Sequence, residues 1–224
     1  MVLRRHRPVG EAKGRADEPH WPASLAVLAA LVLYITLPDK LVFGPKWLLP
    51  SLEVALLVPL TIASPRRHYE EGPKIRRTSI ALIGLVNVAN VTSLVLLVEH
   101  LLRGGKAGGT QLILSALVIW FTNVLIFGLW YWELDRGGPG GRTHPQPGPP
   151  DFLFPQTSSP SLAPPHWRPS FVDYLYVSLT NATAFSPTDT MPLTAMAKAL
   201  MAAQSLASLI TVALVAARAV NILN

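Results

Sequence analysis

Residues 171–224 constrain the fold of this chain more than any other stretch. A short apolar and aromatic segment runs from Phe171 to about Leu179, and a polar turn follows over residues 180–194. A helix-forming run then extends from about Met196 to Leu223, with no charged residue between Lys198 and Arg218. At about 1.5 Å per residue, that charge-free run spans a hydrocarbon core of roughly 30 Å. The pattern predicts a short re-entrant helix, a polar turn and a membrane-spanning helix, an arrangement that lines pores and cavities.

The composition also indicates a membrane protein. Charged residues make up 14% of the chain and hydrophobic residues 50%, whereas soluble domains carry about 25% charged residues. The chain contains no cysteine, which excludes disulfides, thiolate metal sites and cysteine nucleophiles. The net charge of +6 comes from basic residues beside apolar runs. It is therefore interpreted as a topology signal and an attraction to anionic headgroups rather than as nucleic-acid binding.

Four further apolar runs are predicted to span the membrane. They cover about residues 21–37, 46–63, 80–98 and 112–132, so residues 21–132 form a four-helix membrane region. With the last helix, the predicted fold is an all-α membrane protein of about five transmembrane helices plus one short re-entrant-type helix. Residues 133–170 contain many Pro and Gly residues, and such a segment is predicted to be a disordered linker.

Basic residues set the predicted orientation. Residues 1–20 form a basic tail, and residues 64–77 contain five Lys or Arg residues in one short loop. The positive-inside rule places both on the cytoplasmic side. The predicted location is therefore the cell (inner) membrane, with multiple passes and a cytoplasmic N-terminus. The linker 133–170 is then cytoplasmic as well.

Several polar residues fall within the predicted spans. Glu53 is either an anchor near the end of its span or a buried functional acid. Asn87 and Asn90 share one face of their helix and either hydrogen-bond a neighbouring helix or line a polar path. Gln204, Ser208 and Thr211 recur at i, i+4 and i+7, which predicts one face turned away from lipid.

Enzymatic activity is not predicted. The sequence has no nucleophile elbow, zinc-binding helix, P-loop or dinucleotide-binding glycine pattern. All six histidines fall outside the interiors of the predicted spans, so the hydroxyls of the last helix have no local base. No catalytic residue, metal ligand, cofactor or nucleic-acid partner is predicted; the expected partners are the lipid bilayer and further copies of the chain.

The C-terminal segment resembles a family of uncharacterised bacterial integral membrane proteins. The matching residues are the aromatic arm 173–180, Thr188-Asp189, and the Val-Asn-Ile-Leu ending at 220–223. The resemblance covers roughly the last quarter of the chain and implies no established activity. More remotely, the segment looks like the pore helix, filter and inner helix of potassium channels. A potassium filter needs glycines, and residues 180–189 contain none, so a carbonyl-ring potassium filter is not expected.

Two hypotheses for the function follow. In the first, the protein is a small ion-channel-like or carrier-like pore, in which several copies assemble around a polar constriction. The predicted constriction residues are Thr180, Asn181, Thr183, Ser186, Thr188 and Asp189. In the second, the protein is a non-transporting scaffold, and the same polar residues lock the helix bundle together. A capping role for Asp189 or Thr190 at the last helix, with Pro192 in its first turn, fits the second hypothesis.

Overall fold

A computed structural model describes residues 21–42, 45–47, 51, 73–103, 109–143, 148–184 and 189–223. The basic tail 1–20, most of the second predicted span with Glu53, and the two candidate residues Ser186 and Thr188 lie outside the described residues. The described part is predominantly helical.

Three of its helices are long and apolar enough to cross a membrane. They are α3 (Pro73–Leu102), α4 (Gly109–Leu134) and α8 (Ala195–Leu223). A shorter apolar helix, α1, runs from Trp21 to Thr36 and is followed by the 3-10 turn η1 (Asp39–Leu41). α3 starts seven residues before the predicted span 80–98. The apolar pattern did not predict this start, because the first residues of the helix include Arg76 and Arg77 and are polar.

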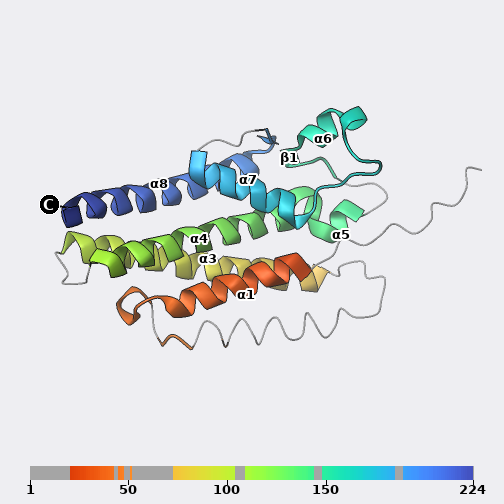
Figure 1. The fold of residues 1–224 in the computed structure, drawn as a ribbon. Coiled ribbons are helices and arrows are strands. Elements are labelled where there is room, and N and C mark those ends of the chain that lie inside the picture. The colour runs from red at the N-terminus through yellow and green to blue at the C-terminus, as the bar shows by residue number, and fades with distance from the viewer. Residues whose placement is uncertain are drawn as a thin grey trace, which may run out of the picture.

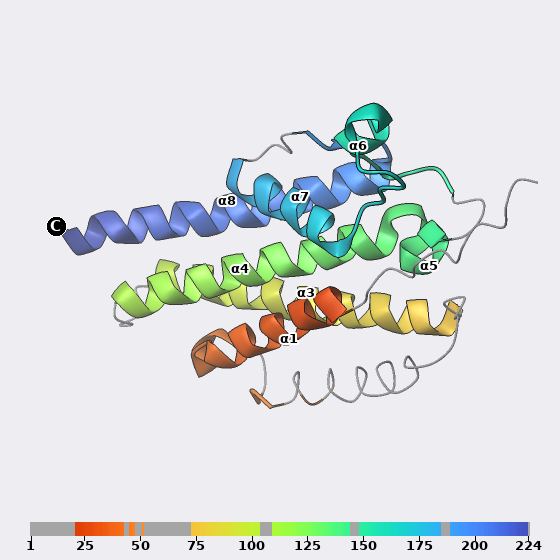
Figure 2. The same ribbon diagram turned by 45° about the vertical axis from the view of Figure 1, so that its right-hand side comes forward.

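Helix α4 lies at the centre of the bundle, with α1 and α3 on one side and α7 (Phe171–Ala184) and α8 on the other (Figures 1 and 2). Residues near the start of α1 and of α3 pack against the second half of α4. Residues near the ends of α1 and α3 pack against the first half of α4. Both helices therefore run antiparallel to α4, and the starts of α1 and α3 lie at one end of the bundle.

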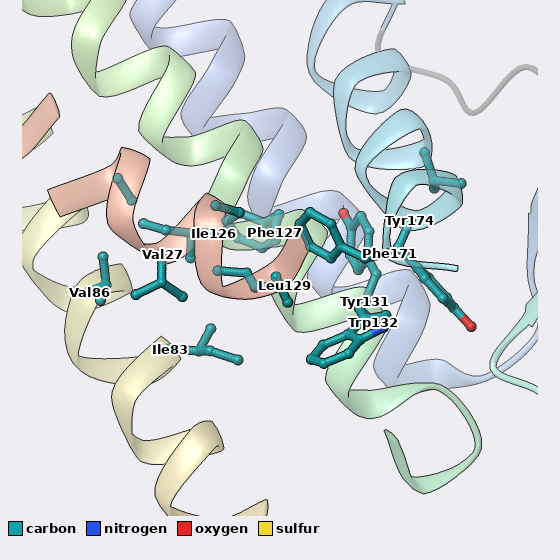
Figure 3. Packing of buried hydrophobic residues seen from close by; sticks show 14 of the residues in the cluster. Val27, Ile83, Val86, Ile126, Phe127, Leu129, Tyr131, Trp132, Phe171 and Tyr174 are labelled. Atoms are coloured by element: carbon teal, nitrogen blue, oxygen red, sulfur yellow. The ribbon is translucent and has the colours of Figure 1, made fainter. Parts of the chain in front are cut away.

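The core at that end is apolar and aromatic (Figure 3). Val27 of α1 and Ile83 and Val86 of α3 meet Ile126 and Phe127 of α4. Farther along α4, the ring of Trp132 lies edge-on to Phe171, with 6.0 Å between ring centroids. Aromatic pairs in this geometry stabilise beyond their buried area. α7 is thus joined to the bundle by its first residue.

Helix α7 enters beside the start of α8 and runs in the same direction. Ser178 of α7 is level with Gln204 of α8, and Ala182 is level with Ser208. Ser208 is thirteen residues after Ala195, the first residue of α8, which corresponds to about 20 Å. α7 therefore ends partway along the bundle. Met191 is back at the end where α7 began, because it pairs with Leu153 in a two-residue antiparallel ladder of β1 (Phe152–Leu153) and β2 (Met191–Pro192).

Two sequence predictions for this hairpin were wrong. Residues 180–184 continue α7 and are not a turn. The hydroxyls of Thr180 and Thr183 bond to carbonyls of this same helix. The last helix is capped by neither Asp189 nor Thr190. Thr194 is its N-cap, since the Thr194 hydroxyl accepts from the backbone N–H of Ala197 at 3.2 Å. Pro192 lies in β2 and not in the first turn of α8.

The prediction of a disordered linker over residues 133–170 was also wrong for the described part. The structure has η2 (Asp135–Gly137), α5 (Gly138–Thr143), β1, α6 (Pro155–Ser158) and η3 (Pro160–Leu162) in this segment. The many Pro and Gly residues suggested that the segment buries too little apolar area to become ordered. However, Phe152 and Phe154 are buried against Tyr174. These aromatic side chains supply the apolar area that orders the segment.

Candidate functional site

A buried group of polar side chains joins α4, α7 and α8 at the centre of the bundle. We call it the hairpin network. Its members are Tyr131 of α4, Ser178 and Asn181 of α7, and Gln204 and Ser205 of α8. Tyr131, Ser178 and Gln204 are fully buried and Asn181 nearly so. The network thus connects α7 to the two longer helices beside it, α4 and α8.

Gln204 is the hub of the hairpin network. Its Oε1 accepts hydrogen bonds from the Tyr131 hydroxyl at 2.6 Å and from Asn181 Nδ2 at 2.8 Å. Its Nε2 donates to the carbonyl oxygen of Ser178 at 2.9 Å and to Ser178 Oγ at 2.6 Å. The amide therefore uses both donors and both acceptor positions. A buried amide satisfied in this way stabilises and specifies the packing around it.

The other members are bonded just as completely. Asn181 Nδ2 also donates to the carbonyl of Met201 at 3.0 Å, and Ser205 Oγ donates to Asn181 Oδ1 at 3.1 Å. Ser178 Oγ donates to the carbonyl of Val124 at 2.7 Å. The amide of Gln204 is fully used within the chain, and both the nitrogen and the oxygen of the Asn181 amide are bonded within it.

A second polar link holds the last turn of α7. The last carbonyls of a helix have no intrahelical partner. Ser208 Oγ donates to the carbonyl of Ala182 at 2.7 Å and accepts from Trp120 Nε1 at 2.6 Å. The Ser208 hydroxyl of α8, itself held by the Trp120 indole of α4, therefore satisfies one carbonyl at the end of α7. Such pairing is needed where a helix ends away from the water-facing ends of a bundle.

A third polar cluster closes the end of the bundle where α7 enters. Asp135 is fully buried. Its carboxylate accepts from the Tyr174 hydroxyl at 2.5 Å and from the backbone N–H groups of Asp151 and Phe152 at 2.7 and 3.3 Å. Arg142 donates to the carbonyl of Trp132, at the C-terminus of α4, where a cation is favoured. This cluster fixes the segment after α4 against the start of α7.

The six predicted constriction residues do not form one group in the described part. Asn181 belongs to the hairpin network. Thr180 is half-buried and Thr183 exposed on the outer side of α7, and their hydroxyls bond to carbonyls of the same helix. Asp189 is exposed near the start of α8. The two remaining residues of the six lie outside the described residues, as stated above.

The polar residues of the last helix lie together on its inner face. Gln204, Ser208 and Thr211 are all buried, and Thr211 bonds to the carbonyl of Ala207 in its own helix at 2.8 Å.

The polar residues of α3 differ from these. Asn90 and Ser93 are buried. Asn87 Oδ1 and Ser93 Oγ are shielded from solvent and have no hydrogen-bond partner in the described part of the chain.

The outer side of the hairpin is exposed in the single chain. On α7, the stripe of exposed side chains consists of Val172, Tyr176, Leu179 and Thr183. α8 is the least buried of the three long helices, with 22% of its most apolar window inside the protein against 61% for α4. α7, which has 14 residues and ends partway along the bundle, is thus covered by α4 and α8 on its inner side and is exposed on its outer side.

Sequence reasoning missed Tyr131, Ser178, Asp135 and Arg142. Tyr131 lies at the end of the apolar run 112–132, which was considered only as a span, and Ser178 lies in a segment that was considered for its apolar residues. A signal was present in the sequence: Ser178, Asn181 and Ala182 recur at i, i+3 and i+4 and so share one face of a helix. In the part of the chain that the structure describes, no group of three or more His, Asp or Glu residues could hold a metal ion.

No protein-family model, no curated protein and no solved structure matches this chain. The resemblances drawn from residues 173–180, 188–189 and 220–223 therefore stay predictions.

Proposed function

We propose that this protein is a multi-pass integral membrane protein whose C-terminal hairpin, α7 and α8 with the residues between them, forms the wall of a small polar pore between copies of the chain. The observation that carries the proposal is the position of α7. It enters beside the start of α8, ends partway along the bundle, and the chain is back at the same end by Met191.

The proposed protein crosses the membrane five times. α1, α3, α4 and α8 provide four of the crossings. α1 and α3 run in the same direction, so the chain has to travel back along the bundle between Val42 and Pro73. That return supports a crossing by the predicted span 46–63.

The proposed orientation places the starts of α1, α3, α7 and α8 at the cytoplasmic face. Arg76 and Arg77 lie in the first turn of α3, and Arg136 and Arg142 follow the end of α4. All four belong to the same end of the bundle, where α1 also begins. The count of Lys and Arg beside the spans, rather than net charge, sets orientation, and this count supports the proposal.

The outer side of α7 is proposed to face water that other copies enclose. Irregular backbone at membrane depth survives where protein or a water-filled cavity covers it. α7 ends at that depth, and its outer stripe carries the Thr183 hydroxyl beside aliphatic groups. A second and further copies would exclude lipid from this side. Asp189, exposed at the mouth of the hairpin, would favour cations.

A scaffold without transport is the second candidate, and the hairpin network favours it. Asn181 and Gln204 are bonded entirely within the chain, as expected of residues that lock a fold. In the pore hypothesis these residues hold α7 at its depth and do not touch the permeant. The two candidates therefore differ in what the outer side of α7 contacts.

Cation flux into vesicles that contain the purified protein tests the proposal. The wild-type protein is expected to pass potassium, sodium or protons, and Asp189→Asn is expected to reduce the flux several-fold, because it removes the carboxylate at the hairpin mouth. Asp39→Asn is the matched control, since Asp39 lies in η1 at the opposite end and pairs with Lys46. Wild-type vesicles that pass none of the three cations would leave the scaffold as the better account.

Reporter fusions test the orientation separately. Residues 148–150 are described and exposed or half-buried, so they accept an inserted reporter without loss of core packing. A green fluorescent protein inserted there is expected to fluoresce, and alkaline phosphatase is expected to be inactive. The reverse pattern would place this end of the bundle outside the cytoplasm.

A further inference from the structure

The end of the bundle where α3 begins and α4 ends carries arginines without strong carboxylate partners. Arg77 is exposed, and Arg136 is half-buried. Neither takes part in an ion pair within the described part of the chain. Arg76 is 3.9 Å from Glu133, a long contact, and its side chain is 36% exposed. At the opposite end, by contrast, Lys46 pairs with Asp39 at 3.0 Å, and Arg103 pairs with Glu99.

The carboxylates near these arginines are occupied by other donors or are buried. Asp135 accepts from a tyrosine hydroxyl and two backbone amides. Asp151 accepts from the Thr194 hydroxyl at 2.6 Å and from the backbone N–H of Arg136. Glu133 is 2% exposed. Beside these arginines, Glu133 and Asp135 are buried and Asp151 is half-buried, whereas Arg77 is exposed, so the arginines contribute most of the charge that is exposed there.

The three arginines belong to two chain segments, the start of α3 and the residues after α4, which meet where Arg76 lies beside Glu133 and Gly138. Arg76 and Arg77 are in the first turn of α3, where the helix dipole adds positive potential. Arg136 follows Glu133 by three residues. Gly138, with φ +87°, brings its backbone against Arg76: a Cβ on Gly138 would lie 3.6 Å from Arg76 Nε and 3.0 Å from the Glu133 carbonyl. A side chain at Gly138 would therefore press on the Glu133 carbonyl, with Arg76 Nε at ordinary contact distance.

Tryptophans mark the depth of this end. Trp21, at the start of α1, is 68% exposed, and Trp130 packs beside Gly84, two turns into α3 from Arg77. Tryptophan side chains favour the level of the headgroups at the edge of the hydrocarbon. Arg77 lies about two turns nearer the bundle end than Gly84, so in the proposed membrane placement it reaches the level of the lipid phosphates.

We propose that Arg76, Arg77 and Arg136 form a binding site for the phosphate of an anionic phospholipid headgroup in the leaflet at this end of the bundle. The site rests on the proposed membrane placement but not on a pore. Guanidinium groups bind phosphate through paired N–H donors, and each basic residue near an anionic surface adds about 1 kcal/mol, close to a fivefold change in association.

Electron spin resonance with spin-labelled lipids tests the site. The full-length protein is reconstituted in phosphatidylcholine vesicles, and association of labelled phosphatidylglycerol is compared with that of labelled phosphatidylcholine. The wild-type protein is expected to prefer phosphatidylglycerol. Arg77→Gln and Arg136→Gln are each expected to lower the preference about fivefold, and Arg77→Lys is expected to retain more of it than Arg77→Gln.

Arg103→Gln is the matched control, because it removes a charge that is already paired at the opposite end, and it is expected to leave the preference unchanged. Circular dichroism shows whether Arg77→Gln or Arg136→Gln has lost its helices. If one of them has, the lipid preference of the other variant decides the test. Equal binding of the two lipids by the wild-type protein would overturn the site. So would an equal loss in the control, or displacement of the labelled lipid by millimolar inorganic phosphate. Cation flux plays no part in this readout, so this proposal and the pore proposal fail independently.

Discussion

Helices α3 and α7 both pack against α4, but they are held there by different forces. α3 has 30 residues and meets α4 through aliphatic side chains such as Ile83 and Val86. Its buried Ser93 hydroxyl has no partner in the described part of the chain. α7 has 14 residues, and the polar side chains on its inner face are bonded to α4 and α8.

The difference follows from length. A helix long enough to cross a bilayer is kept in place by its match to the hydrocarbon thickness, so its contacts need only be apolar and well packed. A helix that ends partway along the bundle has no such constraint on its depth. For such a helix, directional hydrogen bonds constrain the depth, since each bond is satisfied at one depth and orientation only. We infer that the hairpin network fixes the depth of α7.

The largest expected effect comes from Gln204→Leu. The substitution leaves the Tyr131 hydroxyl and the Asn181 amide without their acceptor and removes two donors to Ser178. At about 0.6–1 kcal/mol for each of the four bonds lost, the free energy of unfolding is expected to fall by roughly 2–4 kcal/mol. Titration with SDS in mild detergent measures this change. The exposed Leu206 provides the control: Leu206→Gln is expected to change stability by less than half as much.

A pair of glycines tests close approach of the helices. A Cβ on Gly128 would lie 3.2 Å from the Leu175 Cα on α7, whereas one on Gly84 would lie 3.9 Å from a ring atom of Trp130. Gly128→Ala is expected to destabilise the protein by about 1–2 kcal/mol because backbone has to move. Gly84→Ala is expected to be neutral or stabilising by up to about 1 kcal/mol, since alanine favours a helix. Equal changes in the stability of the Gly128→Ala and Gly84→Ala variants, measured by thermal unfolding, would contradict the closer approach of α7 than of α3 to α4.

The smallest expected effect distinguishes two buried serines. Ser178 Oγ donates to Val124 and accepts from Gln204, whereas Ser93 Oγ has no partner in the described residues. Both side chains are almost completely buried. Ser178→Ala is expected to cost about 1 kcal/mol, and Ser93→Ala about zero or a slight gain, because it removes a buried unsatisfied hydroxyl. The two variants, unfolded side by side, show whether hydrogen bonds hold α7 more than α3.

Charge-free runs were enough to predict the long helices but not their caps. The runs before Glu99 and before Glu133 gave α3 and α4, because apolar length alone identifies a spanning helix. The N-cap of α8 was assigned to Asp189 or Thr190, although Thr194 also precedes the helix. All three are good cap residues. Residues 191–192 pair with residues 152–153 in the ladder of β1 and β2, so the helix begins after them and Thr194 is the cap. No local sequence pattern reveals this long-range contact.

The hairpin network could be predicted in part. The periodicity of Gln204, Ser208 and Thr211 placed them on one face, and the structure shows all three buried. Their partners could not be predicted, because Tyr131 and Ser178 meet Gln204 through the packing of three helices. The ordered segment after α4 was missed for a similar reason: a few aromatic side chains, with Asp135 and Arg142, outweigh its many Pro and Gly residues.

Water access to α7 at membrane depth tests the central claim most directly. The chain contains no cysteine, so single-cysteine variants need no background changes. Thr183 lies on the outer side of α7. Phe121 is exposed on α4 and is at a similar depth, because its neighbour Trp120 reaches the end of α7 through Ser208.

In intact membranes, Thr183→Cys is expected to react with a water-soluble maleimide, and Phe121→Cys is expected to react at least tenfold more slowly, because a thiol in hydrocarbon does not ionise. Equal and slow reaction of both variants would show that the outer side of α7 contacts lipid or packed protein. That result would contradict a water-filled path along the hairpin.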